Sequence, residues 1–117
     1  MSTSHRNNLL EGHAGEHARA VFANHGIDTM WTLSGAHVFP LYDAATKSSP
    51  PMRLVDVRHE QTAVFGAEAT AKLTRRPGLA VVTAGPGVTN AVSGIAQAYF
   101  NGVPLLTMGG RAPQFRW

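Results

Sequence analysis

The 117-residue sequence contains no cysteine, little charge and no long apolar run. Without cysteine, the chain can form neither a disulfide framework nor a metal site built on thiolates. Charged residues make up 15% of the sequence, against roughly 25% in an average soluble protein. We therefore expect another domain or subunit to cover part of the surface, the alternative being a small, neutral α/β domain.

No stretch approaches the roughly 20 apolar residues of a membrane span, and residues 1–12 lack the apolar run of a signal peptide. A cytoplasmic protein that does not associate with a membrane is therefore expected. Ten Lys and Arg against seven Asp and Glu give a net charge of +3. Because the basic residues are scattered and not interleaved with aromatic ones, the pattern argues against nucleic-acid binding.

Apolar periodicity predicts strands that alternate with helices after a flexible N-terminus at residues 1–12. We expect helices at 13–25, 38–45, 60–74 and 88–100, and strands at 29–33, 53–57, 79–83 and 104–108. This alternation predicts an α/β domain with a parallel sheet and helices on both faces. Because no helix follows the fourth strand, the domain at residues 13–117 is expected to be incomplete at its C-terminus.

Ligands of an open parallel sheet bind beyond the carboxyl ends of the strands. Three polar or glycine-containing clusters follow predicted strands there, at Ser34–His37, His59–Gln61 and Ala84–Asn90. Glu60 begins a helix, where position alone favours an acidic residue that stabilises the helix dipole. His59 has no spaced partner and is more typical of a structural residue. None of the histidines shows metal spacing, so no metal ligand is predicted.

The Gly85-Pro86-Gly87 turn lies between an apolar strand and a helix. It suggests close approach of the backbone to a flat ligand or to another helix, although a simple tight turn has the same sequence. It matches neither the P-loop nor the dinucleotide-binding pattern. The helix that follows carries Ala91, Gly94, Ala96 and Ala98, which suits a helix-on-helix subunit contact. Small residues packed against a sheet would give the same pattern.

Taken together, these clusters resemble a known family. The resemblance rests on RHEQTAVFGAEATAKLTRRPGLAVVTAGPGVTN, followed by IAQAYFNGVPLLTMGGRAP, and earlier on HGIDTMWTLSGAHVFPLYDA. These stretches are similar to the N-terminal pyrimidine-binding domain of thiamine diphosphate-dependent enzymes, in particular the acetolactate synthase large subunit. The similarity runs from His13 to Arg111. Residues 33–37 look most like actinobacterial acetolactate synthase homologues and the 2-hydroxyacyl-CoA lyase branch.

The resemblance implies that Glu60 is the catalytic glutamate that activates the cofactor. A carboxylic acid there hydrogen-bonds a ring nitrogen of the aminopyrimidine and favours the imino tautomer, which takes the proton from C2 of the thiazolium. Glu60, Pro86, Asn90 and Gly35 are therefore expected to bind the cofactor.

Ala36 and His37 stand in a turn that the resemblance brings near the thiazolium and the substrate. Many synthases have small residues at these two positions. Ala36 and His37 are accordingly expected to contact the substrate and to influence its identity. The alternative for His37 is that it only caps the next helix.

The implied function is that of an acetolactate synthase-like carboligase of branched-chain amino acid biosynthesis, acting on a small 2-keto acid. The alternatives are a 2-hydroxyacyl-CoA lyase or oxalyl-CoA decarboxylase, or a non-catalytic remnant or partner module. The family's site for Mg²⁺ and the diphosphate lies on another domain, whose Gly-Asp-Gly pattern is absent here. The chain alone is thus expected to be inactive and to need the remaining domains or a separate subunit, with FAD as a further cofactor of some full-length enzymes. A homodimer or tetramer is expected to form through the 88–100 helix.

Overall fold

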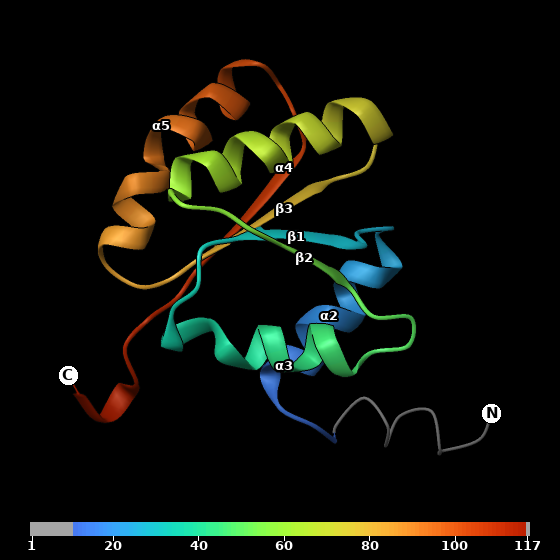
Figure 1. The fold of residues 1–117 in the computed structure, drawn as a ribbon, viewed down its shortest axis with the longest axis vertical. Helices are drawn as coiled ribbons and strands as arrows, with labels where there is room; N and C mark the ends of the chain where they lie inside the picture. Colours follow the sequence, from blue (N-terminus) through green and yellow to red (C-terminus); the bar gives the residue numbers. More distant parts are fainter. Residues whose placement is uncertain (1–10, 117) are drawn as a thin grey trace.

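The computed structural model describes residues 11–116, and they form a four-stranded parallel sheet between two layers of helices (Figure 1). The elements are α2 (Ala14–Asn24), β1 (Thr29–Thr32), a 3-10 helix (Ala36–Val38), α3 (Phe39–Lys47), β2 (Arg53–Asp56), α4 (Glu60–Thr74), β3 (Gly78–Val82), α5 (Pro86–Phe100), β4 (Leu105–Gly109) and a 3-10 helix (Gln114–Arg116). Every predicted helix and strand is present, with ends that differ by no more than two residues. The flexible terminus predicted for residues 1–12 lies almost entirely outside the described residues.

The strand order is β2-β1-β3-β4, and every neighbouring pair is parallel. Helices α2 and α3 cover one face of the sheet, whereas α4 and α5 cover the other (Figure 1). The predicted α/β class with helices on both faces is therefore confirmed. The chain leaves β1 toward α3 and leaves β3 toward α5, so the direction of winding changes between these two strands. Such a switch point is where open α/β sheets bind ligands.

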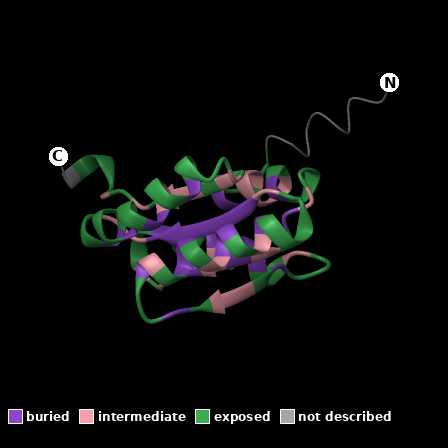
Figure 2. Ribbon diagram, turned by 90° about the horizontal axis from the view of Figure 1, so that it is seen from above, coloured by how far each residue is buried: buried purple, intermediate pink, exposed green. Residues whose placement is uncertain are grey.

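Strand β3 is buried along its whole length. Leu79 and Val81 pack into the cluster that includes Phe22 of α2, while Ala80 and Val82 pack into the opposite cluster under α4 and α5. This division follows from the two-residue period of a strand. Figure 2 shows that the buried residues concentrate in the sheet, between the helical layers. The near-continuous apolar run predicted to be an interior strand is confirmed as one.

Small residues bring α4 and α5 into close contact within the chain. A Cβ atom built on Gly94 of α5 would lie 2.8 Å from the Cβ atom of Val64 on α4. Ala91 and Ala98 of α5 are also buried, and Ile95 packs against the core cluster on this side of the sheet. The expectation that the small residues of this helix face another subunit is therefore wrong for Ala91, Gly94 and Ala98, because these residues are already buried within the chain.

Candidate functional site

The predicted site residues all lie at or just beyond the carboxyl ends of the strands. Gly35 and His37 follow β1, Glu60 follows β2, and Pro86 and Asn90 belong to the start of α5, which follows β3. They form two groups, one around Glu60 and one around Gly35.

Glu60 is held by Asn90 across the α4–α5 contact. Its side chain is buried, with 8% of the residue exposed, and Asn90 Nδ2 donates a hydrogen bond of 3.1 Å to Glu60 Oε2. Within residues 11–116, no second donor contacts this carboxylate. The other oxygen, Oε1, is therefore available to exchange a hydrogen bond with a ligand.

His59 explains why the helix begins at Glu60. Its backbone is extended (φ −151°, ψ 142°), and its Nδ1 accepts a hydrogen bond of 3.1 Å from the backbone N–H of Gln61. This contact satisfies one of the unpaired donors at the start of α4. The structural interpretation of His59 is confirmed, since the residue caps the helix that presents Glu60.

The second group forms where the loops after β1, β3 and β4 meet. A Cβ atom on Gly35 would lie 2.2 Å from both Cβ and Oγ1 of Thr83, and one on Gly110 would lie 2.7 Å from the Cβ of His37. His37 Nδ1 lies 3.4 Å from Thr83 Oγ1. Gly35 therefore permits the close approach of two loops at the switch point between β1 and β3.

Ala36 and His37 are both exposed on the 3-10 helix that follows Gly35. Among the residues that the structure describes, no side chain caps this helix or α3, so the alternative in which His37 serves as a helix cap is wrong. The contact with Thr83 holds the imidazole at the rim of the sheet instead.

Gly85 and Pro86 shape the start of α5. Gly85 has φ +66° and ψ −116°, a conformation that side-chain-bearing residues rarely adopt. A Cβ atom there would meet nothing within 4 Å, so the backbone angles, not crowding, require glycine. Pro86 is the first residue of the helix, where its missing N–H costs no hydrogen bond. Pro86 is exposed at the rim.

Sequence reasoning missed Glu68, which is only 2% exposed. Glu68 Oε2 accepts from Gln97 Nε2 at 2.6 Å, while Oε1 accepts from Asn101 Nδ2 at 2.8 Å and lies 3.0 Å from Lys72 Nζ. The hydrogen bonds from Asn101 and Lys72 lower the pKa of Glu68. The available signal in the sequence was its place eight residues after Glu60, two i, i+4 steps along the same helix.

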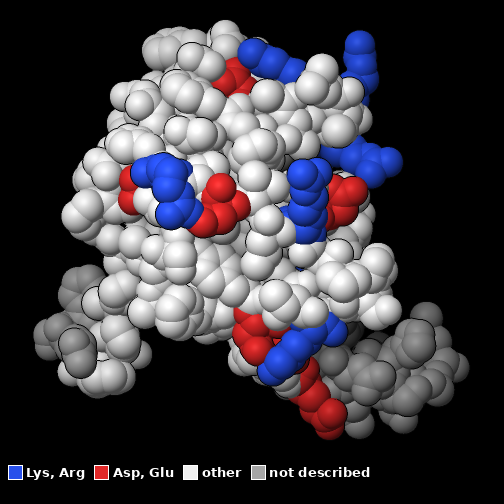
Figure 3. All heavy atoms as spheres, in the orientation of Figure 1, with Lys and Arg blue, Asp and Glu red and all other residues white. Residues whose placement is uncertain are grey.

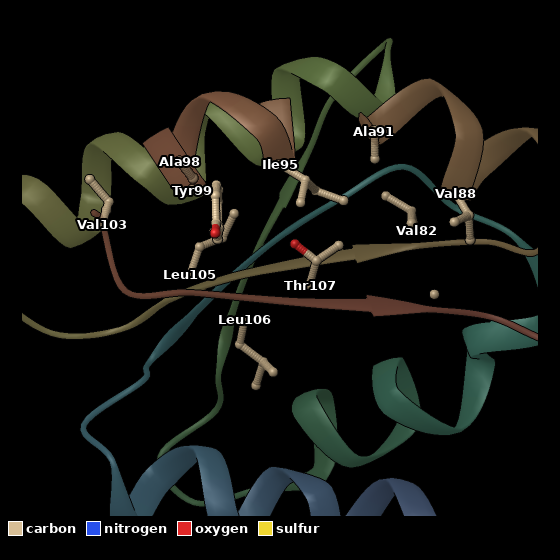
Figure 4. A pocket seen from close by; sticks show the side chains of 11 residues that line it. Val82, Val88, Ala91, Ile95, Ala98, Tyr99, Val103, Leu105, Leu106 and Thr107 are labelled. Atoms are coloured by element: carbon tan, nitrogen blue, oxygen red, sulfur yellow. The ribbon is translucent and has the colours of Figure 1, made fainter. Parts of the chain in front are cut away.

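A groove of about 510 Å³ runs between α5 and the edge strand β4, beside the two groups and not within them (Figure 4). Its lining is almost entirely apolar and comprises Val82, Val88, Ala91, Ile95, Ala98, Tyr99, Val103, Leu105, Leu106, Thr107 and Gly109. Thr107 Oγ1 is buried there and has no hydrogen-bond partner in the described part of the chain. Further along α5, Tyr99 and Phe100 are 80% and 84% exposed. This surface is apolar enough to be covered by a partner.

Three further properties concern metal sites, membrane spans and surface charge. No three His, Asp or Glu side chains between residues 11 and 116 lie close enough together to hold a metal ion. None of the helices in that segment combines the length and apolarity needed to cross a membrane. On the face drawn in Figure 3, Lys and Arg side chains are dispersed over a mostly uncharged surface.

Residues 13–115 match the family described as thiamine pyrophosphate enzyme, N-terminal TPP binding domain. The chain is 50% identical over 105 residues to the acetolactate synthase large subunit IlvG of Mycobacterium tuberculosis and to a probable acetolactate synthase of Mycobacterium bovis, which is 90% of this chain and 19% of each relative. It is 47% identical over 100 residues to 2-hydroxyacyl-CoA lyase 2 of Bos taurus, which is 86% of this chain and 16% of the relative. The chain thus spans less than a fifth of the length of these curated relatives. With the α/β fold and the family match in agreement, the chain belongs to the N-terminal TPP-binding domains of the thiamine pyrophosphate (thiamine diphosphate) enzymes.

Proposed function

We propose that this chain is the cofactor-activating domain of a cytoplasmic, acetolactate synthase-like enzyme that decarboxylates a small 2-keto acid and joins the fragment to a second one. The observation that carries the proposal is the buried Glu60 carboxylate, fixed by Asn90 and with one oxygen left for a ligand. The 50% identity to the acetolactate synthase large subunit of Mycobacterium tuberculosis supports this reaction class.

The residues at the rim fit an aminopyrimidine ring. Glu60 offers a carboxyl oxygen that has no partner among residues 11–116, and the turn at Gly85 leaves open space beside its backbone. When bound, thiamine diphosphate supplies the carbon that carries the carbanion chemistry. With the cofactor bound, Glu60 would share a proton with the ring nitrogen, while Asn90 holds the carboxyl group through Oε2 and leaves Oε1 for the ligand. Burial limits competition from water for that hydrogen bond.

The remaining roles are divided between the loops and other domains. Gly35 and Pro86 form the walls of the cofactor site, and Ala36 and His37 face the substrate. The diphosphate and Mg²⁺, and FAD where the full-length enzyme uses it, belong to domains outside this chain. The apolar surface of α5 is the contact to those domains or to a second copy in a dimer or tetramer, through residues such as Tyr99 and Phe100.

A second candidate is cleavage of a 2-hydroxyacyl thioester. The 47% identity to 2-hydroxyacyl-CoA lyase 2 of Bos taurus favours it. Both reactions would use Glu60 in the same way, so they differ at the substrate end of the site, near Ala36 and His37.

The test is a chimaera in which residues 13–115 replace the matching segment of the Mycobacterium tuberculosis acetolactate synthase large subunit. We expect the chimaera to convert pyruvate with thiamine diphosphate and Mg²⁺, and the 117-residue chain alone to show no turnover. A folded, cofactor-binding chimaera without turnover, assayed beside the active recipient enzyme, would contradict the proposal. Preference of the chimaera for a 2-hydroxyacyl thioester would favour the second candidate.

A further inference from the structure

Three contacts join α4 and α5 at successive turns. From the carboxyl rim inward they are Glu60 with Asn90, Val64 with Gly94, and Glu68 with Gln97 and Asn101. The contacts occur in the same order along both helices. A displacement of one helix along the other would therefore change all three together, including the contact at Glu60.

The middle contact brings the two helices close together but supplies no hydrogen bond between them. Gly94 has no side chain, and its neighbours Ala91 and Ala98 project only a methyl group each toward the interior. Helices are held in register when large side chains of one fit between those of the other. A row of small residues allows close approach but forms few such steric stops.

The third contact belongs to the Glu68 cluster, which we define as Glu68, Lys72, Gln97 and Asn101. Unlike the apolar middle contact, it consists of hydrogen bonds, which depend on direction as well as distance. Its two interhelical hydrogen bonds, 2.6 and 2.8 Å long, end on one carboxylate whose side chain is only 3% exposed. Hydrogen bonds to a charged acceptor are shorter and stronger than neutral ones. A buried carboxylate is also costly to leave without its partners. The cluster therefore resists both sliding and rotation of α5 against α4.

We propose that Glu68 is a positioning residue, which fixes the axial position of α5 against α4 and so sets the hydrogen bond between Asn90 and Glu60. A buried polar contact between packed helices can specify their register. The consequence for catalysis rests on the proposed function of Glu60. The coupling between the two ends of the helix pair does not, and it can be measured without cofactor.

The measurement is the side-chain amide resonance of Asn90, recorded by nuclear magnetic resonance on the full chain. In the double variant Gln97→Ala, Asn101→Ala, both interhelical bonds to Glu68 are removed while Glu68 keeps its partner Lys72 and the core stays unaltered. We expect the Asn90 amide resonances to move toward those of an unbonded amide. Lys72→Ala is the matched control, because Lys72 contacts the same carboxylate from within α4, and it should leave Asn90 unchanged.

A second variant, Glu68→Gln, keeps the test decisive if the double variant does not fold. In Glu68→Gln, the Gln97 amide can rotate and accept from the new amide, so the interhelical bonds re-form and the Asn90 resonances should stay near those of the parent chain. Asn90 resonances in the double variant that coincide with those of the parent and of Lys72→Ala would overturn the proposal.

Kinetics of the chimaera supply an independent readout. The double variant should lower kcat by up to about 100-fold, the effect that a displacement of about 1 Å can produce, with KM for pyruvate little changed. Loss of thermal stability with unchanged kcat would leave Glu68 a structural residue and overturn its positioning role. An inactive parent chimaera would refute the proposed function instead, and the Asn90 resonances would still decide whether the two ends of the helix pair are coupled.

Discussion

The backbone of Gly35 lies so close to the Thr83 side chain that a Cβ atom at position 35 would overlap with it. Gly35 has an extended backbone (φ −169°), so steric contact, not backbone strain, excludes other residues there. We predict that Gly35→Ala lowers the free energy of unfolding by about 1–3 kcal/mol, the usual cost of overpacking. Combining it with Thr83→Gly should recover part of the loss. The check is urea unfolding of both single variants and the double variant, and strictly additive losses would contradict the steric explanation.

His37 is the residue at the rim whose replacement separates the two candidate reactions. If its imidazole binds the substrate carboxylate, His37→Ala removes a hydrogen bond to a charged group, worth about 1.5–3 kcal/mol. We predict that the variant chimaera loses kcat/KM for pyruvate more than for a 2-hydroxyacyl thioester. Equal losses of kcat/KM on both substrates, together with a lower Tm, would show that His37 has only a structural role, through its contact with Thr83.

The pairing of α4 with α5 has a pH dependence that follows from Glu68. Hydrogen bonds from Asn101 and Lys72 lower its pKa in the folded state below the ordinary value of 4.5. The ionised carboxylate therefore contributes stability above that value, and the contribution disappears as pH falls through the lowered pKa. We predict that the parent chain loses more stability between pH 6 and pH 3 than Glu68→Gln does, measured by urea unfolding.

Comparing the parent chain with Glu68→Gln separates the pH-dependent contribution of Glu68 from those of the other acidic residues. The pKa of Asp43 is also lowered, by its hydrogen bonds with Lys47 and His13, but that contribution is common to both chains. Stability curves that remain parallel over this pH range would show that the Glu68 carboxylate contributes nothing as an ion.

Helix α5 has an outer surface that the fold leaves uncovered. Val92, Tyr99 and Phe100 are more than half exposed, and the rings of Tyr99 and Phe100 pack edge to face, with centroids 5.6 Å apart. We predict that the chain associates at high concentration and that Tyr99→Ser with Phe100→Ser reduces the association. Sedimentation measures this, with Val21→Ser on the opposite helical layer as the control. A monomeric parent chain would contradict the prediction.

At the scale of the whole molecule, the architecture could be predicted from the sequence because its strands and helices have different periods. The run at Leu79–Val82 is apolar throughout, and so short an apolar run between a Pro-Gly pair and a glycine turn is typical of a strand buried on both faces. The position of the candidate site residues at the carboxyl ends of the strands could be predicted for the same reason, once the strand ends were known. The exact loop contacts could not, since the approach of Gly35 to Thr83 joins residues 48 positions apart.

The role of Glu68 shows a second limit of sequence reasoning. A glutamate four residues before a lysine on a helix is typical of an exposed ion pair, and local sequence does not reveal that Gln97 and Asn101 lie opposite. The small residues of α5 were similarly ambiguous, because packing on α4 and packing on a subunit require the same side chains. Both outcomes depend on how α4 and α5 lie against each other, which is a property of the assembled fold.

The central claim is that Glu60 activates thiamine diphosphate, and the rate of hydrogen–deuterium exchange at C2 of the bound cofactor tests it most directly. In Glu60→Gln the side-chain carbonyl can still accept from Asn90, so the change removes the acid and keeps the shape. We predict that exchange in the variant chimaera is about 10²–10⁴-fold slower than in the parent chimaera, the usual range for general acid–base catalysis, with the amount of bound cofactor unchanged. An exchange rate equal to that of the parent would contradict the assignment of Glu60.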